Sequence, residues 1–304
     1  MRALVIFLLF ITVIVQAQDI TVLKTDQLTS LKDGELIISA VSPDGKSVLV
    51  SSAGYKSLFV ININLKNVLR ISDQPGAGYE PCFSADGSTV FFRSDEFTGL
   101  RKYSSLLKYV LASGKTEIIE TKSRDLTSPL LINNQLIYSV GGNQKKRLVA
   151  PDNLKSSEEN IFVVLENLTP VLYVNGQRKP IKPCGEGNYI WVSLSPDKTK
   201  LLFNFQGKAT YVSDLEGKIV SAAGRINAPK WLNNEIIVGM NDVDDGYRIL
   251  SSDIICYSLI TNQITNLTST PLEAEMYPFP LAGKNKIVYQ TLTGEIFLMS
   301  LSVK

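Results

Sequence analysis

A short phrase that recurs along the chain decides its fold. In residues 84–92 (SADGSTVFF), a polar turn of Ser, Asp and Gly precedes an apolar, strand-like run. Residues 42–50 (SPDGKSVLV) and 195–203 (SPDKTKLLF) repeat the pattern, and weaker copies lie at residues 133–138 (NNQLIY), 233–238 (NNEIIV) and 283–289 (GKNKIVY). Recurrence of one supersecondary unit is typical of solenoids and propellers.

The segments between these turns are expected to be β-strands. Residues 57–64 (SLFVININ) are rich in β-branched and aromatic side chains and alternate between apolar and polar near their end. No stretch keeps a helical period for more than about three turns. Asp and Gly suit the turns because Asp can bond its neighbouring backbone and Gly tolerates a positive φ. The sequence therefore predicts an all-β chain.

The spacing of the repeats predicts a six-bladed β-propeller, with seven blades as the alternative. The strands that follow the turns start at Val48, Val90, Leu136, Leu201, Ile236 and Ile287, at intervals of 42, 46, 65, 35 and 51 residues. A four-stranded propeller blade takes ~40–50 residues. The longest interval contains two apolar runs, at residues 161–165 and 171–174, and an Asn175-Gly176 hairpin turn. It has room for an extra hairpin or for a seventh blade.

The two ends of the chain are expected to close the ring together. The last repeat supplies strands near residues 286–290 and 295–301 and then stops one strand short. Residues 20–23 (ITVL) offer the missing strand, and we expect them to pair alongside Phe297 and Met299. Closure of this kind removes the exposed edges of an open sheet.

The first 17 residues have the features of a cleavable signal peptide. Arg2 is followed by an apolar stretch from Leu4 to Val15, and Val15 and Ala17 are small enough for a cleavage site. The apolar stretch is shorter than the ~20 residues that span a bilayer, and no cysteine follows it to carry a lipid anchor. We expect residues 18–304 to form one propeller domain that is periplasmic or secreted and at most peripheral to a membrane.

Composition excludes several classes of function. The chain has 31 Lys and Arg against 29 Asp and Glu, so it has little long-range attraction for nucleic acid. It has no histidine, which excludes Ser-His-Asp and Cys-His mechanisms and the usual zinc sites. Its three cysteines are too few for a disulfide framework and are expected to be reduced. Residues 241–246 (NDVDDG) lack the oxygen ligands of a calcium loop and indicate an acidic hairpin tip. We expect no metal and no cofactor.

The repeat resembles that of TolB-type, WD40-like β-propellers. The resemblance rests on residues 79–87 (YEPCFSADG), 194–197 (LSPD) and 42–45 (SPDG), and on the Leu-Thr at residues 267–268, and it covers nearly the whole mature chain. It implies a propeller, here without the α/β domain that precedes the propeller of TolB. By analogy it also implies a binding or scaffolding role in the bacterial cell envelope.

The candidate binding site is the axial face, where the loops that lead into the innermost strands converge. The alternative is an ordinary solvated rim. These loops supply Tyr79, Glu80, Arg124, Asp125, Glu186, Tyr189, Arg225, Asn227, Glu275 and Tyr277. Trp191 and Trp231 are expected to be core aromatics between blades, with a sugar-stacking platform as the alternative.

The function expected from these features is non-catalytic binding, as a monomer, of a protein or glycan partner in the cell envelope. The alternative is a carbohydrate-active enzyme, either a glycoside hydrolase or a protein like a polysaccharide lyase. Glycoside hydrolysis requires two carboxylates at a fixed separation, and Glu80, Glu186 and Glu275 are the candidates. The absence of histidine counts against a lyase that uses a His-bound metal.

We expect the mature protein to begin at or near Gln18 and to be soluble, because the apolar stretch is short and small residues end it. Intact-mass measurement of the exported protein checks this. A species that retains residues 1–17 in a membrane fraction would contradict it.

Overall fold

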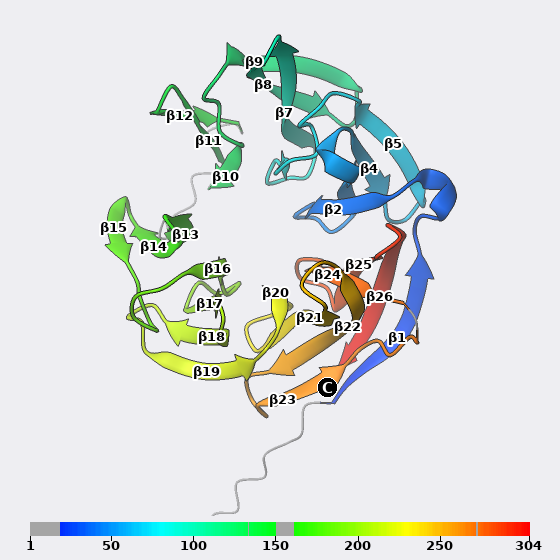
Figure 1. Cartoon of the computed structure of the whole chain (residues 1–304), viewed down its shortest axis with the longest axis vertical. Helices are drawn as coiled ribbons and strands as arrows, with labels where there is room; N and C mark the ends of the chain where they lie inside the picture. The colour runs from blue at the N-terminus through cyan, green and yellow to red at the C-terminus, as the bar shows by residue number, and fades with distance from the viewer. Residues whose placement is uncertain (1–18, 133, 150–160, 272) are drawn as a thin grey trace, which may run out of the picture.

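The computed structural model describes residues 19–132, 134–149, 161–271 and 273–304, and this part of the chain forms a seven-bladed β-propeller (Figure 1). The predicted signal peptide lies outside the described residues. Each blade is an antiparallel sheet whose first strand faces the central axis, and side chains pack between the faces of neighbouring blades. Among the described residues, no helix is long and apolar enough to span a membrane.

The strands follow one another around the ring in chain order. Blade 1 contains β2 (Leu36–Val41), β3 (Ser47–Ser52), β4 (Leu58–Asn62) and β5 (Asn67–Ser72), and blade 2 contains β6 (Cys82–Phe83), β7 (Thr89–Thr98), β8 (Arg101–Val110) and β9 (Lys115–Ser123). Blade 3 contains β10 (Leu130–Ile132), β11 (Gln135–Val140) and β12 (Asn143–Leu148), and blade 4 contains β13 (Ile161–Glu166), β14 (Thr169–Val174) and β15 (Gln177–Pro180). Blade 5 contains β16 (Tyr189–Leu194), β17 (Lys200–Phe205), β18 (Ala209–Asp214) and β19 (Ile219–Gly224). Blade 6 contains β20 (Asn227–Trp231), β21 (Ile236–Asp244), β22 (Ile249–Ser258) and β23 (Gln263–Asn266). Blade 7 contains β24 (Glu275–Pro280), β25 (Lys286–Thr291), β26 (Ile296–Val303) and β1 (Ile20–Gln27). Two short 3₁₀ turns, η1 (Leu31–Asp33) and η2 (Ala53–Tyr55), lie in the connections.

The prediction of six blades is wrong, and the alternative of seven is correct. The long interval in the repeat contains blade 4, a sheet of its own with two hairpin turns. The turn at Asn175-Gly176 has the residues that a tight hairpin favours. The other turn is Asn167-Leu168, with φ of 48° and 59°. Leu rarely adopts a positive φ, so the sequence marked only one of the two hairpin turns of this blade.

The three copies of the recurring phrase that begin with serine form the same hydrogen-bonded turn. The Ser42 hydroxyl donates to the Asp44 carboxylate at 2.7 Å and accepts the backbone N–H of Ser47 at 2.9 Å. The turn that begins at Ser195 has the same pair of bonds, at 2.6 and 2.9 Å. The third residue after the serine has a positive φ in each turn, 63° at Gly45 and 59° at Lys198. The turn therefore fixes the register between the first and second strands of a blade.

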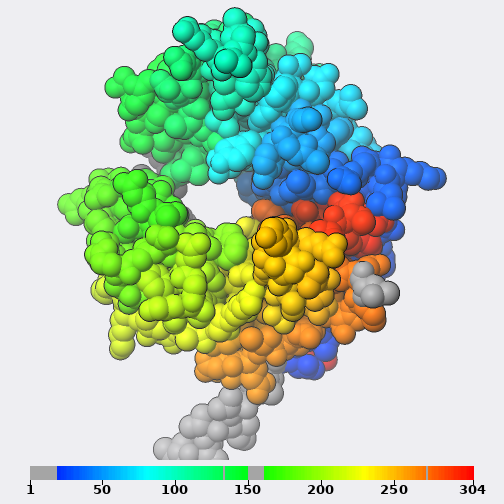
Figure 2. Space-filling view, in the orientation of Figure 1, coloured from blue at the N-terminus to red at the C-terminus, as the bar shows by residue number. Residues whose placement is uncertain are grey.

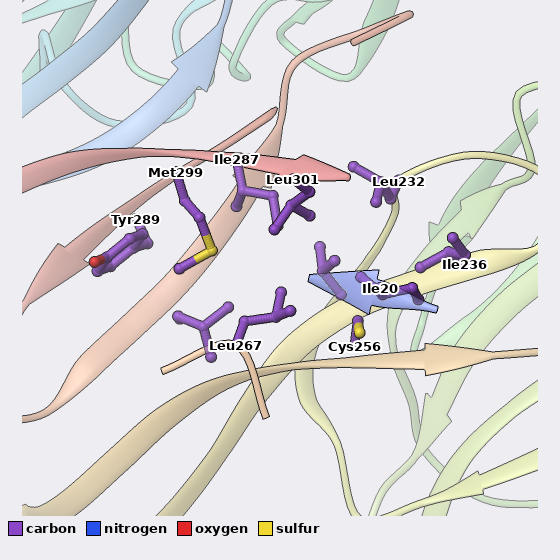
Figure 3. Packing of buried hydrophobic residues seen from close by; sticks show 11 residues of the cluster. Ile20, Leu232, Ile236, Cys256, Leu267, Ile287, Tyr289, Met299 and Leu301 are labelled. Carbon is purple, nitrogen blue, oxygen red and sulfur yellow. The ribbon is translucent and has the colours of Figure 1, made fainter. Parts of the chain in front are cut away.

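The N-terminal strand closes the ring, as the sequence predicts. β1 pairs antiparallel with β26, the last strand of the chain, along its whole length. Ile20 is 6% exposed and packs into a cluster that joins blades 6 and 7 (Figure 3). In that cluster it lies with Leu232 and Ile236 of the sixth blade and with Ile287 and Met299 of the seventh.

The register of the closing strand differs from the expected one. Met299 and Phe297 lie opposite Thr25 and Gln27, because a bulge shifts the pairing after Val22. Val22 and Leu23 are exposed, Leu23 by 67%. The closing strand is therefore anchored through Ile20 rather than through the whole of residues 20–23.

The three cysteines are free thiols. Cys256 is buried in the cluster of Figure 3, and Cys82 and Cys184 are partly buried. Burial raises the pKa of the Cys82 thiol to about 12. These thiols are packing residues, because the reactive form of cysteine is the thiolate.

Replacing Ile20 with Ala is expected to lower the free energy of unfolding by about 2–4 kcal/mol, because it empties a buried site in the cluster that closes the ring. Leu23→Ala is the matched control and should change it by less than about 0.5 kcal/mol, since Leu23 is exposed on the same strand. Chemical denaturation of both variants measures the difference. Equal effects would mean that the N-terminal strand is not anchored at Ile20.

Candidate functional site: the axial channel

A regular backbone feature directs side chains toward the axis. Each innermost strand of blades 1, 5, 6 and 7 contains a β-bulge, and in blades 5, 6 and 7 the bulged residue has a left-handed backbone. The innermost strand of each blade leads into a turn. The residue that lies four positions before the first residue of this turn is Ile38 in blade 1, Glu80 in blade 2, Trp191 in blade 5, Ala228 in blade 6 and Tyr277 in blade 7. All five line one central pocket. A bulge re-aims the side chain that it carries, and Trp191, Ala228 and Tyr277 lie in such bulges, so the repeat itself builds this part of the pocket wall.

The pocket lies at the centre of the ring, where the space-filling view shows a hollow (Figure 2). Its volume is about 700 Å³, and we call it the upper pocket. Its walls are mostly apolar and aromatic and include Leu36, Ile38, Tyr55, Trp191, Met276 and Tyr277. Its charged residues are Glu35, Glu80 and Lys230. Clefts of ~300–1,000 Å³ with apolar walls and few polar groups are typical ligand sites.

A second axial pocket, the lower pocket, has a volume of about 390 Å³. The innermost strands of blades 5, 6 and 7 and the end of β2 supply its wall. Trp191, Lys230 and Phe279 line both pockets, so they form the waist between them. Lys230 is the one charged residue on the wall of the lower pocket.

The lysine at the waist is partly buried and has no carboxylate partner. The Nζ of Lys230 lies 4.2 Å from the centroid of the Phe279 ring, a cation–π contact. No ion pair involves Lys230 in the part of the chain that the structure describes. Burial lowers the pKa of its ammonium group, because the surrounding protein disfavours the charged form.

Of the ten residues expected on the axial face, Glu80 and Tyr277 line the upper pocket. Tyr79 lies beside it: its ring contacts Tyr55 edge-on, with centroids 5.3 Å apart, and lies under the guanidinium of Arg93 at 5.1 Å. The structure therefore brings Glu80 and Tyr277 together on the wall of this pocket.

The other expected residues lie outside both axial pockets. Arg225 is exposed and pairs with Asp244 at 3.5 Å, and Asn227 donates to Asp242 at 2.6 Å. Glu186 is exposed and pairs with Lys182 at 2.7 Å. Arg124 and Asp125 are exposed in the connection before β10, and Tyr189 is a buried core residue.

Glu275 also faces away from the axis. Glu275 is 3% exposed and lines a separate pocket with Thr268 and Tyr289. Burial raises the pKa of the Glu275 carboxyl. Since Glu80, Glu186 and Glu275 lie in three different places, they do not form the pair of carboxylates that glycoside hydrolysis requires.

The two tryptophans differ in their environment. Trp231 is a core aromatic between blades 5 and 6, as predicted, and its ring N–H donates to the Ser193 carbonyl at 3.4 Å. The same prediction is wrong for Trp191, which is 39% exposed at the waist. The bulge between Ile190 and Ser193, with Trp191 at φ 51°, reverses the alternation that would have buried it.

A sequence signal for these bulges exists in two blades. Pro229 and Pro278 each lie inside the bulge of an inner strand, directly after a residue with a left-handed backbone. Proline cannot donate to the ladder of a sheet and is confined there to edges and bulges. Trp191 is not followed by a proline, and no residue near Lys230 in the sequence indicates that Lys230 faces the channel.

Residues 241–246, which the sequence indicates as an acidic hairpin tip, form the end of β21 and the turn into β22. The Asp245 carboxylate accepts the backbone N–H groups of Tyr247 and Arg248 at 2.9 Å each. No cluster of three possible metal ligands occurs among the described residues.

Replacing Lys230 with Met is expected to raise the free energy of unfolding by about 1 kcal/mol at neutral pH, because it removes a partly buried cation that has no partner. Lys208→Met is the control: Lys208 also lies over an aromatic ring, Phe205, but is exposed, so the change should be under about 0.5 kcal/mol. Thermal or denaturant unfolding measures both.

The gain from Lys230→Met should shrink as the pH rises. With a lowered native pKa, the unfolded chain binds more protons than the native one between that pKa and the ordinary lysine value of 10.5. The stability of the unmodified protein therefore increases through this window. A gain that is independent of pH would show that the Lys230 charge is not its source.

Comparison with known proteins supports the fold. No protein-family model and no curated protein sequence matches the chain. The β-propeller domain of Cps50 (Swd1) from Myceliophteria thermophila matches 93% of this chain and 100% of its own, with 10% identity and a TM-score of 0.56. Hsv2 from Kluyveromyces lactis matches 89% of this chain and 98% of its own, with 11% identity and a TM-score of 0.53. TolB from Acinetobacter baumannii matches 77% of this chain and 54% of its own, with 16% identity and a TM-score of 0.45. The chain is a β-propeller, the fold that the TolB-like repeat implies.

Proposed function

We propose that this chain is a non-catalytic binding module of the bacterial envelope, periplasmic or secreted, whose upper pocket holds a short apolar segment of a partner protein. The observation that carries the proposal is the pocket itself, about 700 Å³ of axial space walled by aromatic and aliphatic side chains. Most of its wall lies on paired strands. Sites on regular elements hold their geometry better than sites on loops.

The polar groups of the pocket favour a peptide over a glycan. A sugar exposes many hydroxyl groups, and each one that loses water needs a new hydrogen-bond partner. Gln290, one of the few polar residues on the wall, already accepts the backbone N–H of Ile38 at 2.8 Å. Apolar side chains of a peptide fit the remaining wall with little loss of hydrogen bonds.

The carboxylates of the pocket support binding rather than hydrolysis. Glu35 and Glu80 both line the upper pocket, and both are exposed to solvent. In glycoside hydrolases, the acid is kept protonated by an apolar environment. Exposed carboxylates instead suit the polar rim that surrounds an apolar binding centre.

Selection of peptides from a random library on the immobilised protein tests this function. The selected peptides should contain apolar or aromatic anchors and should bind Trp191→Ala at least about tenfold more weakly, because removing a central aromatic anchor commonly costs ~2 kcal/mol or more. Fluorescence titration measures the affinities.

Tyr247→Ala is the matched control. Tyr247 is an exposed aromatic at the tip of the β21–β22 hairpin and does not line either axial pocket. Its removal should leave binding unchanged. Peptides that bind Trp191→Ala as well as the unmodified protein, or selection of oligosaccharides but no peptides from a parallel glycan array, would contradict the proposal.

A further inference from the structure

The charge of the axial channel is uneven along its length. The upper pocket has Glu35 and Glu80, which are exposed to water, in addition to Lys230. On the wall of the lower pocket, Lys230 is the one charged residue and the other side chains are mostly apolar. The waist and the lower pocket therefore form a region in which a single cation faces apolar walls.

Two donors in this region have no acceptor in the part of the chain that the structure describes. The ammonium of Lys230 lies against the face of the Phe279 ring. The hydroxyl of Ser193, on the wall of the lower pocket, is buried and has no hydrogen-bond partner in the described part of the chain. An unsatisfied buried donor is uncommon in native proteins, so the Ser193 hydroxyl needs a physical explanation.

A purely structural role does not explain Lys230. Lys208 shows what a structural cation–π contact looks like here, because its Nζ lies 5.0 Å from the centroid of Phe205 while the side chain remains exposed. Lys230 is held in the channel, where burial lowers its pKa. An apolar residue of the same length would fill this place without that cost. The cost is offset if a ligand brings the missing negative charge.

We propose that Lys230 binds an anionic group on the ligand, a carboxylate carried by an apolar or aromatic body that lies against Trp191 and Phe279. The inference rests on the proposed function and specifies its ligand as an apolar peptide segment that ends in, or displays, a carboxylate. Lys230 donates to the carboxylate at the waist. The aromatic residues on either side exclude water, which strengthens a charge-assisted hydrogen bond.

A pair of dyes that differ in one charge tests the proposal. Anilinonaphthalenesulfonate carries an anion on an aromatic body, and phenylnaphthylamine has the same aromatic body without the charge. The chain contains two tryptophans, so Trp231→Phe leaves Trp191 as the single energy-transfer donor. Transfer from Trp191 to either dye then reports binding in the neighbourhood of Trp191.

In this background, Lys230→Met should weaken binding of the anionic dye at least about tenfold, as expected for loss of one partner of a buried charge pair. Binding of the neutral dye should change less than about twofold. Lys230→Arg should restore the preference for the anion. Lys208→Met removes the same charge from the surface and should change neither affinity.

The outcomes separate this inference from the proposed function. If both dyes bind near Trp191 and Lys230→Met affects them equally or not at all, the anion site is refuted while the apolar pocket stands. If neither dye shows transfer from Trp191, the pocket does not bind apolar bodies, and both proposals fail. If Lys208→Met has the same effect as Lys230→Met, the preference comes from net charge, and the inference is wrong.

Discussion

The serine hydroxyl of the repeat is the interaction on which this propeller depends. In blades 1, 2 and 5 it accepts a backbone N–H across the turn and donates to the aspartate two residues later. The hydrogen bond from Ser84 is the main cause of the lowered pKa of the Asp86 carboxyl, which shows that the bond stabilises the ionised form. Because these bonds fix the first residue of the second strand, they also fix which residue of the first strand points at the axis. In strands, a slip of one residue would turn every side chain to the other face.

The parts of the structure that depend on local chemistry could be predicted from the sequence. The turns, the strands and the ring closure follow from Ser, Asp and Gly placements and from an unpaired strand at each end. The seventh blade was missed as the first choice because its first turn, Asn167-Leu168, has no copy of the recurring phrase and Leu168 adopts a backbone conformation that its residue type disfavours. Trp191 was placed in the core because a strand that enters a turn was expected to pack against the neighbouring blade, and the bulge exposes this side chain instead. Both errors arise where the backbone departs from the regular repeat, and composition does not reveal such departures.

The site expected from the sequence consisted largely of charged residues in loops. In the structure, two of these residues pair with other charged side chains instead of facing the channel. Arg225 and Glu186 form ion pairs on the surface, which contribute little to stability and leave no free charge for a ligand. The groups that remain available lie on the inner strands, where Trp191 and Lys230 face the channel. No pattern in the sequence marks Lys230, because its position depends on the packing of blade 6 against blade 7. The spacing of four residues before the turn would have identified Trp191 and Tyr277 together.

Ring closure and the channel are physically linked. The contact between Lys230 and Phe279 crosses from β20 to β24, the innermost strands of blades 6 and 7. The same two blades are held together by the cluster that contains Ile20, and Leu232 of that cluster is two residues from Lys230 (Figure 3). A strand contributed by the opposite end of the chain therefore supports the boundary at which the waist is formed. Protein interiors are densely packed and therefore transmit displacements from one element to the next. Loosening the closing strand should therefore increase the distance between Lys230 and Phe279 before the ring unfolds. The geometry of the channel is thus set by long-range closure as much as by the repeat that lines it.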